Sequence, residues 1–476
     1  MEDTFGFDPF LAFSLIGAFL VVGVLLRAKI RFFQSFLLPS CLIGGTFGTI
    51  FINLRLIDLP FSYFETIAYH FMNIGFISIG LTQNNSKSAE QGNRKKLLRG
   101  SFWMVLMKGI TFPLQALIGL SLMLLFNAVG YKLFPTFGLF LPLGYVEGPG
   151  QALSIANIYK SFGFQHAASI GLMFAVMGYI FCFFLGMPLI RAGLRKGSSA
   201  HGKQDLPDHF LKGILPEKEK AGSEGAVRKT FYSENVDNLA YQLGMIGIVY
   251  LITYSLCYGI SLLLPPGTEK IIWGIFFGIG LAIAVLFTKV MKKLGVAHLV
   301  DPGLQHHVTG FSLDFMIVAT LMAIQMTVVW QYFIPILAIS LGGGIVTLLS
   351  ILYFGKRQED LGLERTVFVY GTYTGAMSTG LLLLRIVDPN FSSDVLKELS
   401  IFPFLVFPFT IGFMVLTTGQ VSWGWGIGQT MGIFTAIFII SLILLKVMNY
   451  WGKPKDIFGD TSSDSPMAGN LQQLEN

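Results

Sequence analysis

Charged residues are scarce in this sequence. Aspartate, glutamate, lysine and arginine make up 13% of its 476 residues, whereas 53% are hydrophobic and 45 are phenylalanine. Soluble domains carry about 25% charged residues, so the composition excludes an ordinary soluble protein and indicates an integral membrane protein. The net charge of +6 does not indicate nucleic-acid binding, because the basic residues cluster between apolar runs, where they act as topology signals.

Cysteines and catalytic motifs are also scarce. Cys41, Cys182 and Cys257 stand singly in apolar surroundings, without metal-ligand spacing or a disulfide pattern. His306 and His307 have no partner cysteines or spaced carboxylates, so a solvated loop is favoured over a metal site. No nucleophile elbow, phosphate loop, HExxH motif or suggestive carboxylate pair is present. We therefore expect neither an enzyme nor a bound cofactor.

The N-terminus lacks the pattern of a signal peptide. Acidic residues at Glu2, Asp3 and Asp8 precede the first apolar run and basic residues follow it, whereas a signal peptide begins with basic residues. We therefore expect residues 10–26 to form a membrane helix with its N-terminus outside.

The sequence does contain long apolar runs. The length of each is close to the roughly 20 residues that a helix needs to cross a bilayer. Five precede a charged segment at 197–238, which we expect to be a cytoplasmic linker, and five follow it. One more precedes a polar tail at 453–476, which is predicted to be disordered. The expected spans are 10–26, 36–54, 64–82, 101–126, 164–190, 241–264, 271–288, 314–330, 334–354, 399–418 and 424–446.

Lysine and arginine set the expected orientation, because they concentrate in loops on the inner side. With the N-terminus outside, the basic loops of both halves lie inside. Each half has an odd number of spans, so the two halves insert with opposite orientations. The predicted fold is an all-α polytopic membrane protein with two inverted-topology five-span repeats, 1–196 and 239–420, plus an extra C-terminal helix at 421–452. The basic residues used are Arg27, Lys29, Arg31, Lys87, Arg94, Lys95, Lys96, Arg99, Arg191, Arg195, Lys196, Lys289, Lys292, Lys293, Lys356, Arg357 and Arg365.

Two glycine-rich interruptions break the apolar pattern, one in each half. Residues 143–157 read LGYVEGPGQALSIAN, and residues 369–380 read VYGTYTGAMSTG. Glycine and proline interrupt helical hydrogen bonding and leave backbone groups without helical partners. At membrane depth, such groups are tolerated only inside protein or beside a water-filled cavity. We interpret each stretch as a re-entrant hairpin before the fifth span of its half. Matched interruptions in two inverted halves indicate a secondary transporter.

These features resemble the bacterial sodium/glutamate symporter family. The resemblance rests on the two inverted halves, the charged linker, the two glycine-rich loops and the run LPSCLIGG at 38–45, and it covers about residues 10–420. It implies a transporter in the bacterial inner membrane that imports an acidic amino acid with Na⁺ and can form a homodimer. The first loop differs from the family, because the aromatic Tyr145 and the charged Glu147 stand among its glycines.

Sodium requires several oxygen ligands, which broken helices supply as freed carbonyls, hydroxyls and amides. The alternative is that these polar side chains only cap and pack the hairpin helices. Asp314, at the start of the eighth expected span, is also explained as an interfacial charge near a helix N-terminus. The residues assigned to the ion are Gly144, Ser154, Asn157, Thr372, Thr374 and Asp314.

An anionic substrate requires a positive charge, and Arg385 just after the second loop is the candidate. Its alternative is a structural pair with Asp388 near the inner face. Glu147 is expected to ligate Na⁺, hold a substrate ammonium or titrate, unless it simply stays in water. Lys108, early in the fourth span, is expected to extend toward the inner face. The residues assigned to the substrate are Glu147, Gly148, Gly150, Gln151, Gly375, Ser378, Thr379 and Arg385.

The sequence therefore favours sodium-coupled symport of L-glutamate or a similar acidic amino acid by alternating access. One alternative is a sodium- or proton-coupled carrier of another organic anion, such as a di- or tricarboxylate. A channel is a further alternative of a different class, and it would conduct without saturation.

Overall fold

A computed structural model describes residues 6–82, 94–195, 212, 237–265, 268–358, 361–388, 393–399 and 401–454. Within these ranges every regular element is a helix. The expected linker at 197–238 and tail at 453–476 lie almost wholly outside the described residues, so their structure stays a prediction.

The first half contains four long helices, α1, α4, α5 and α8, and one shorter apolar helix, α3. Each corresponds to an expected span, because uninterrupted apolar runs favour helices that satisfy their own backbone hydrogen bonds in lipid. Between the last two long helices lies a series of short elements that ends in α7. The elements are α1 (Phe7–Lys29), α2 (Arg31–Ser35), α3 (Ser40–Asn53), α4 (Phe61–Thr82), α5 (Arg94–Ala128), η1 (Phe137–Leu139), α6 (Phe140–Pro142), η2 (Leu143–Glu147), α7 (Pro149–Ser161) and α8 (Ala167–Arg195).

The second half follows the same order, with a broken helix pair before its last expected span. The apolar run expected at 424–446 forms the final helix. The elements are α10 (Asn238–Ser261), α11 (Glu269–Gly274), α12 (Phe276–Lys293), η4 (Ala297–Leu299), α13 (Pro302–Met322), α14 (Met326–Gln331), α15 (Phe333–Gly355), α16 (Gly362–Thr374), α17 (Met377–Val387), α18 (Asp394–Leu399), α19 (Phe402–Thr417), α20 (Gly419–Ser422) and α21 (Ile427–Val447).

Six of the helices in the described part are long and apolar enough to cross a bilayer. Four shorter apolar segments accompany them, at 40–53, 137–147, 377–387 and 405–417. The chain is thus a polytopic helical membrane protein. The six long segments lie in α1, α5, α8, α10, α15 and α21.

The eighth expected span is placed wrongly by the sequence. We expected 314–330, but α13 begins at Pro302 and ends at Met322, and a separate short helix, α14, follows. The carboxylate of Asp301 accepts hydrogen bonds from the backbone N–H groups of Gly303 and Leu304 at 2.8 and 3.2 Å. This cap and a proline in the first turn start the helix early. His306 and His307 therefore lie on α13 as exposed side chains, not in a loop.

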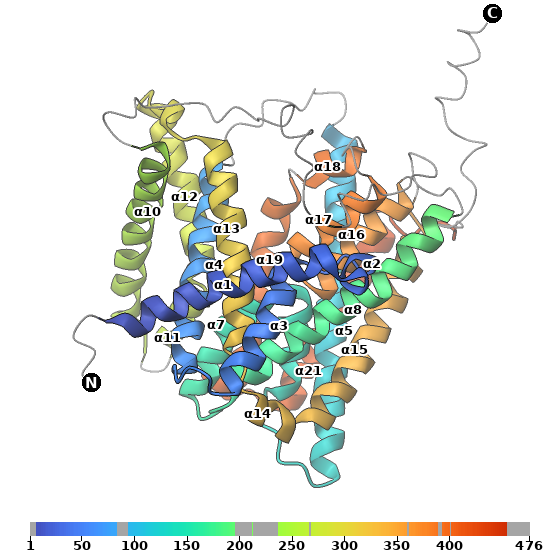
Figure 1. Cartoon of the computed structure of the whole chain (residues 1–476). Helices are drawn as coiled ribbons and strands as arrows, with labels where there is room; N and C mark the ends of the chain where they lie inside the picture. The colour runs from blue at the N-terminus through green and yellow to red at the C-terminus, as the bar shows by residue number, and fades with distance from the viewer. Residues whose placement is uncertain are drawn as a thin grey trace, which may run out of the picture.

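The helices form two packed groups. In the first, α4 packs against both α12 and α13, α3 packs against α1 and α13, and α10 packs against α12. In the second, α5 packs against α15, α19 and α21, while α8 packs against α7, α16 and α17. Figure 1 shows α18 at one end of the molecule and α11 and α14 near the opposite end. α7 belongs to the second group but also contacts α4, α11 and α13, so it lies between the two groups.

Candidate functional site

Two helix breaks lie where the sequence predicted interruptions. The first is at Gly148, between the π-helical turn η2 and α7, where φ is +90°. Pro149 then begins α7, as proline commonly does in a first helical turn. The second break is at Gly375 and Ala376, between α16 and α17, where Gly375 leaves the helical conformation and Ala376 is extended. Both breaks free backbone groups inside an apolar protein.

The two breaks lie against each other. A Cβ atom added to Gly148 would lie 3.2 Å from the carbonyl oxygen of Gly375 and 3.4 Å from the Cβ of Ala376. On its other side, a Cβ added to Gly150 would lie 2.5 Å from the sulfur of Met72 on α4. The junction of the breaks is therefore in contact with the first helix group as well as the second.

Gly148 requires glycine for two reasons, the positive φ and the nearby second break. We predict that Gly148→Ala lowers the rate of transport at least about tenfold and costs about 1–3 kcal/mol of stability, because alanine is strained at this φ. The measurements are initial uptake in proteoliposomes and the melting temperature of the purified protein.

The matched control is Gly163→Ala, because Gly163 has φ +100° but nothing within 4 Å of an added Cβ. This variant should carry a similar backbone strain and transport normally. Equal transport by the two variants would contradict the role of the junction.

One face of α5 holds the first broken segment, η2 and α7, through a buried ion pair. The ammonium of Lys108 lies 2.7 Å from the Oε1 atom of Glu147, and the two side chains are only 4% and 3% exposed. Lys108 also donates a hydrogen bond to the hydroxyl of Thr410 on α19. The expectation that Lys108 extends toward the inner face is therefore wrong, and the carboxylate of Glu147 does not stand in water. A buried carboxylate requires such a partner.

The same face of α5 holds the second broken segment, α16 and α17. The side-chain amide of Gln115 donates to the carbonyl oxygen of Tyr373 at 3.2 Å and to the hydroxyl of Thr347 at 2.8 Å. The hydroxyl of Tyr373 in turn donates to the carbonyl oxygen of Met104 at 2.6 Å. Positions 104, 108 and 115 fall on one face of a helix. α5 is thus attached to both broken helices.

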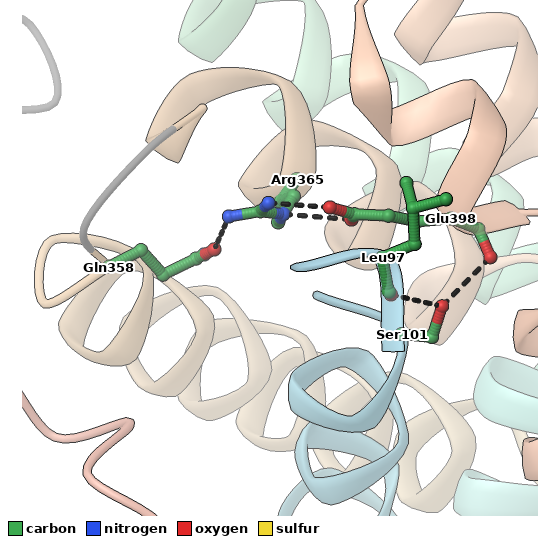
Figure 2. A network of polar contacts seen from close by, with 5 residues as sticks. All are labelled: Leu97, Ser101, Gln358, Arg365 and Glu398. Carbon is green, nitrogen blue, oxygen red and sulfur yellow. Dashed lines mark hydrogen bonds and ion pairs between the residues drawn. The ribbon is translucent and has the colours of Figure 1, made fainter. Parts of the chain in front are cut away.

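A second buried ion pair joins the start of α16 to α18 (Figure 2). The guanidinium of Arg365 on α16 contacts both carboxylate oxygens of Glu398, at 2.9 and 2.5 Å, and donates to Gln358 at 3.4 Å. The hydroxyl of Ser101 on α5 donates to the backbone oxygen of Glu398 at 2.9 Å. From the sequence, Arg365 was predicted only to mark the inner side. In the structure its side chain is 7% exposed and forms a bidentate pair with Glu398.

The hydroxyls predicted to bind the ion, and that of Thr379, which was predicted to bind the substrate, differ in how they are bonded. Thr374 donates to the carbonyl oxygen of Tyr370 at 2.6 Å, and Thr379 contacts backbone groups of Gly371 and Ala376 at 2.8–2.9 Å. The oxygens of Thr372 and Ser154 are buried and have no hydrogen-bond partner within the described ranges. Each of these two hydroxyl oxygens is therefore available to bind an ion or a polar group of a substrate.

Other predicted site residues lie farther from the breaks or toward the surface. Arg385 on α17 is exposed, whereas Asp388 is fully buried and accepts from the backbone N–H of Ser393 at 2.9 Å. Asp314 lies in the middle of α13, so its interpretation as a charge at a helix N-terminus is wrong. Asn157 on α7 is exposed, and Gln151 and Ser378 are partly buried.

Two polar groups near the breaks were missed by the sequence analysis. The hydroxyl of Tyr179 on α8 is buried without a partner in the described part of the chain, and the ring lies 3.1 Å from a Cβ added to Gly375. Thr410 on α19 bonds to Lys108. Both stand in apolar runs, and no local spacing connects them with the glycine loops. Only the tertiary structure brings them there.

The acidic, histidine and cysteine side chains of the described ranges form no group of three or more suited to a metal. Apart from the carboxylate of Glu147, which is paired with Lys108, the oxygens near the breaks are hydroxyls, amides and carbonyls, which are ligands for a hard monovalent cation.

Comparison with known families gives one match. The family model of the sodium/glutamate symporter matches residues 6–355, which includes the first break and ends before α16. No curated protein and no solved structure matches the chain. The match spans well over half of the sequence. The chain belongs to the sodium/glutamate symporter family, whose activity is sodium-coupled glutamate symport.

Proposed function

We propose that the protein imports L-glutamate, or a similar acidic amino acid, together with Na⁺ at the junction of the two helix breaks. The observation that carries this proposal is the contact between the two breaks, where the carbonyl oxygen of Gly375 lies 3.2 Å from the position that a Cβ on residue 148 would take. Broken helices at membrane depth present freed backbone groups to a polar substrate and its ion. Access would alternate between the two sides of this junction.

The helix packing supports an inverted repeat with one re-entrant hairpin in each half. If α3, α4 and α5 correspond to α12, α13 and α15, then α4 packs against its own counterpart, as does α5. The contact of α3 with α13 is likewise matched by the contact of α12 with α4. Such reciprocal pairs are expected from a two-fold relation between halves. We further propose a bacterial inner-membrane location, the domain limits given above and a homodimer.

For the ion, we propose Thr372, Thr374 and the carbonyl of Gly144 as the ligands nearest the junction, with Asp314 a further candidate. Ser154 and Asn157 were predicted to belong to this set, and their surroundings are described below. For the substrate, we propose the backbone at Gly148, Gly150 and Gly375 with the side chains of Gln151, Ser378 and Thr379. Glu147 and Arg385 complete the set, and the pairing of Glu147 with Lys108 makes an indirect role through the hairpin the better supported one.

The first experiment is uptake of labelled L-glutamate into proteoliposomes with an inward Na⁺ gradient or an equal K⁺ gradient. Glutamate is expected to accumulate with the Na⁺ gradient and not with the K⁺ gradient. Bound Na⁺ raises the affinity for glutamate, and bound glutamate raises the affinity for Na⁺ by the same factor. Accumulation driven by a proton gradient without Na⁺, or by another organic anion only, would favour the corresponding carrier. Flux that does not saturate would favour a channel.

For the ion site, we predict that Thr372→Val raises the Na⁺ concentration for half-maximal uptake by about tenfold, because one oxygen ligand is lost while the side chain keeps its size. Uptake at varied Na⁺ concentrations measures this. The control is Thr435→Val, because this hydroxyl on the exposed side of α21 bonds only to its own helix at Met431. An unchanged sodium dependence for Thr372→Val would remove this residue from the ion site.

A further inference from the structure

A cavity of about 310 Å³ lies beside α7, between α4 and α11. It is lined by Tyr69 on α4, by Ser154 and Asn157 on α7, and by Lys270 and Trp273 on α11. Binding pockets for small molecules usually begin near 300 Å³, so a single amino acid or dicarboxylate fits. The cavity lies at the end of the molecule where α11 is found, opposite α18 (Figure 1). By the predicted orientation this is the outer side.

The cavity has one positive charge in its wall. Within the described ranges, no carboxylate forms an ion pair with Lys270. Its ammonium lies over the ring of Phe162, 5.8 Å from the ring centroid. Lys270 is partly exposed. Glu269 precedes it on α11, while the nearest charge on α7 is the exposed Lys160, which does not line the cavity. The cavity therefore favours an anion.

Neutral polar groups surround this charge. The hydroxyl of Ser154 is 1% exposed and has no partner in the described part of the chain, although it lines the cavity. A buried hydroxyl without a partner indicates a missing ligand or water. The phenol of Tyr69 donates to the backbone oxygen of Trp273 at 2.5 Å and so fixes the opposite wall. The site thus combines a cation, a hydroxyl and an amide on a rigid frame.

The cavity is connected to the helix breaks along α7. Gln151, Ser154 and Asn157 follow one another at three-residue steps, so they lie along one side of the helix. Each step is about 4.5 Å along the axis. A carboxylate held between Lys270 and Ser154 is therefore one helical turn from Gln151 and close to the first break at Gly148.

We propose that this cavity is an outer receiving site for the carboxylate group of an acidic amino acid or small dicarboxylate, with Lys270 as its counter-charge. The proposal rests on the proposed function, since the substrate then moves along α7 to the junction of the breaks. It assigns Ser154 and Asn157 to the anion and not to Na⁺. The site increases capture of substrate from outside without taking part in the later conformational step.

The test is Na⁺-driven uptake of L-glutamate by Lys270→Gln. Because an ion pair at a partly exposed site contributes modestly, the KM should rise about three- to fivefold while the maximal rate stays within about 30% of wild type. Lys270→Arg should restore the wild-type KM. The control Lys132→Gln removes an exposed charge outside the cavity, on the same predicted side of the membrane, and should behave as wild type. A KM for Lys270→Gln equal to that of the control would overturn the proposal.

A binding measurement separates this proposal from the proposed function. The melting temperature of the purified protein is measured with L-glutamate, L-aspartate or succinate, each as the K⁺ salt, against equal KCl. Stabilisation of wild type by at least one of them, weakened in Lys270→Gln, supports the receiving site even if wild type fails to accumulate glutamate. Equal stabilisation of the two proteins, or none by any of these anions, rejects it. Failure of Na⁺-driven uptake with intact anion binding would instead reject the proposed function alone.

Discussion

Glu147→Gln is expected to reduce sodium-driven glutamate uptake at least about 100-fold and to lower stability by about 3–5 kcal/mol. The substitution leaves the ammonium of Lys108 buried without its counter-charge, and removing one partner of a buried ion pair has a cost of this size. Glu147 is also the residue before the first break, so loss of the pair is expected to loosen the break itself. Initial uptake rates and melting temperatures measure the two effects.

Lys108→Met should have an effect of similar size, since it leaves the carboxylate unpaired. The matched control is Lys132→Met, because Lys132 is exposed in the segment after α5. The double variant Lys108→Met with Glu147→Met should recover most of the stability, as an apolar pair of similar volume often replaces a buried ion pair without loss. If the single variants melt and transport as wild type does, the pair has no structural role.

Arg365→Met is expected to cost about 3–5 kcal/mol of stability and most of the transport activity. Glu398 is fully buried and receives both guanidinium bonds, so the substitution removes two charged hydrogen bonds from a buried carboxylate (Figure 2). Arg365→Lys should have an intermediate effect, because an ammonium keeps the charge but cannot make the planar bidentate contact. The melting temperature and the uptake rate are compared with wild type.

Arg31→Met is the control for this series, since Arg31 is an exposed arginine of the short helix α2. A difference between Arg365→Lys and Arg365→Met tests the bidentate geometry separately from the charge. An equal loss of stability and uptake in Arg365→Lys and Arg365→Met would mean that the bidentate contact of the guanidinium is essential. No loss in either variant would show that α18 keeps its position without this ion pair.

Much of the fold follows from local sequence. Apolar runs predict α1, α5, α8, α10, α15 and α21, because in lipid the backbone must satisfy its own hydrogen bonds. The break at Gly148 is predicted by glycine and proline, since φ of +90° suits glycine and Pro149 begins a helix. α13 shows where an apolar window fails. Its first turns are polar, and the Asp301–Pro302 cap is a better guide to its start than hydrophobicity.

The candidate site follows from sequence only in part. Glu147 and Lys108 each stand out as charges in apolar surroundings, yet nothing local shows that they pair. The same holds for Arg365 and Glu398, whose partnership depends on how α16 and α18 pack. The contact between the two breaks, and the position of Tyr179 beside Gly375, likewise arise from long-range packing. Such contacts have no periodicity along the chain, so a pattern search cannot detect them.

The attachment of both broken helices to α5 also bears on ion leakage. Glu147 and Tyr373 belong to different broken segments, but Lys108, Met104 and Gln115 bind them to a single helix. If one segment moved alone, it would lose its contacts with α5 while the other kept them. A movement that carries both segments together with α5 keeps these contacts. If the transport site lies at the junction, as proposed, this joint movement disfavours a state open to both sides at once and so limits leakage of Na⁺ through the protein.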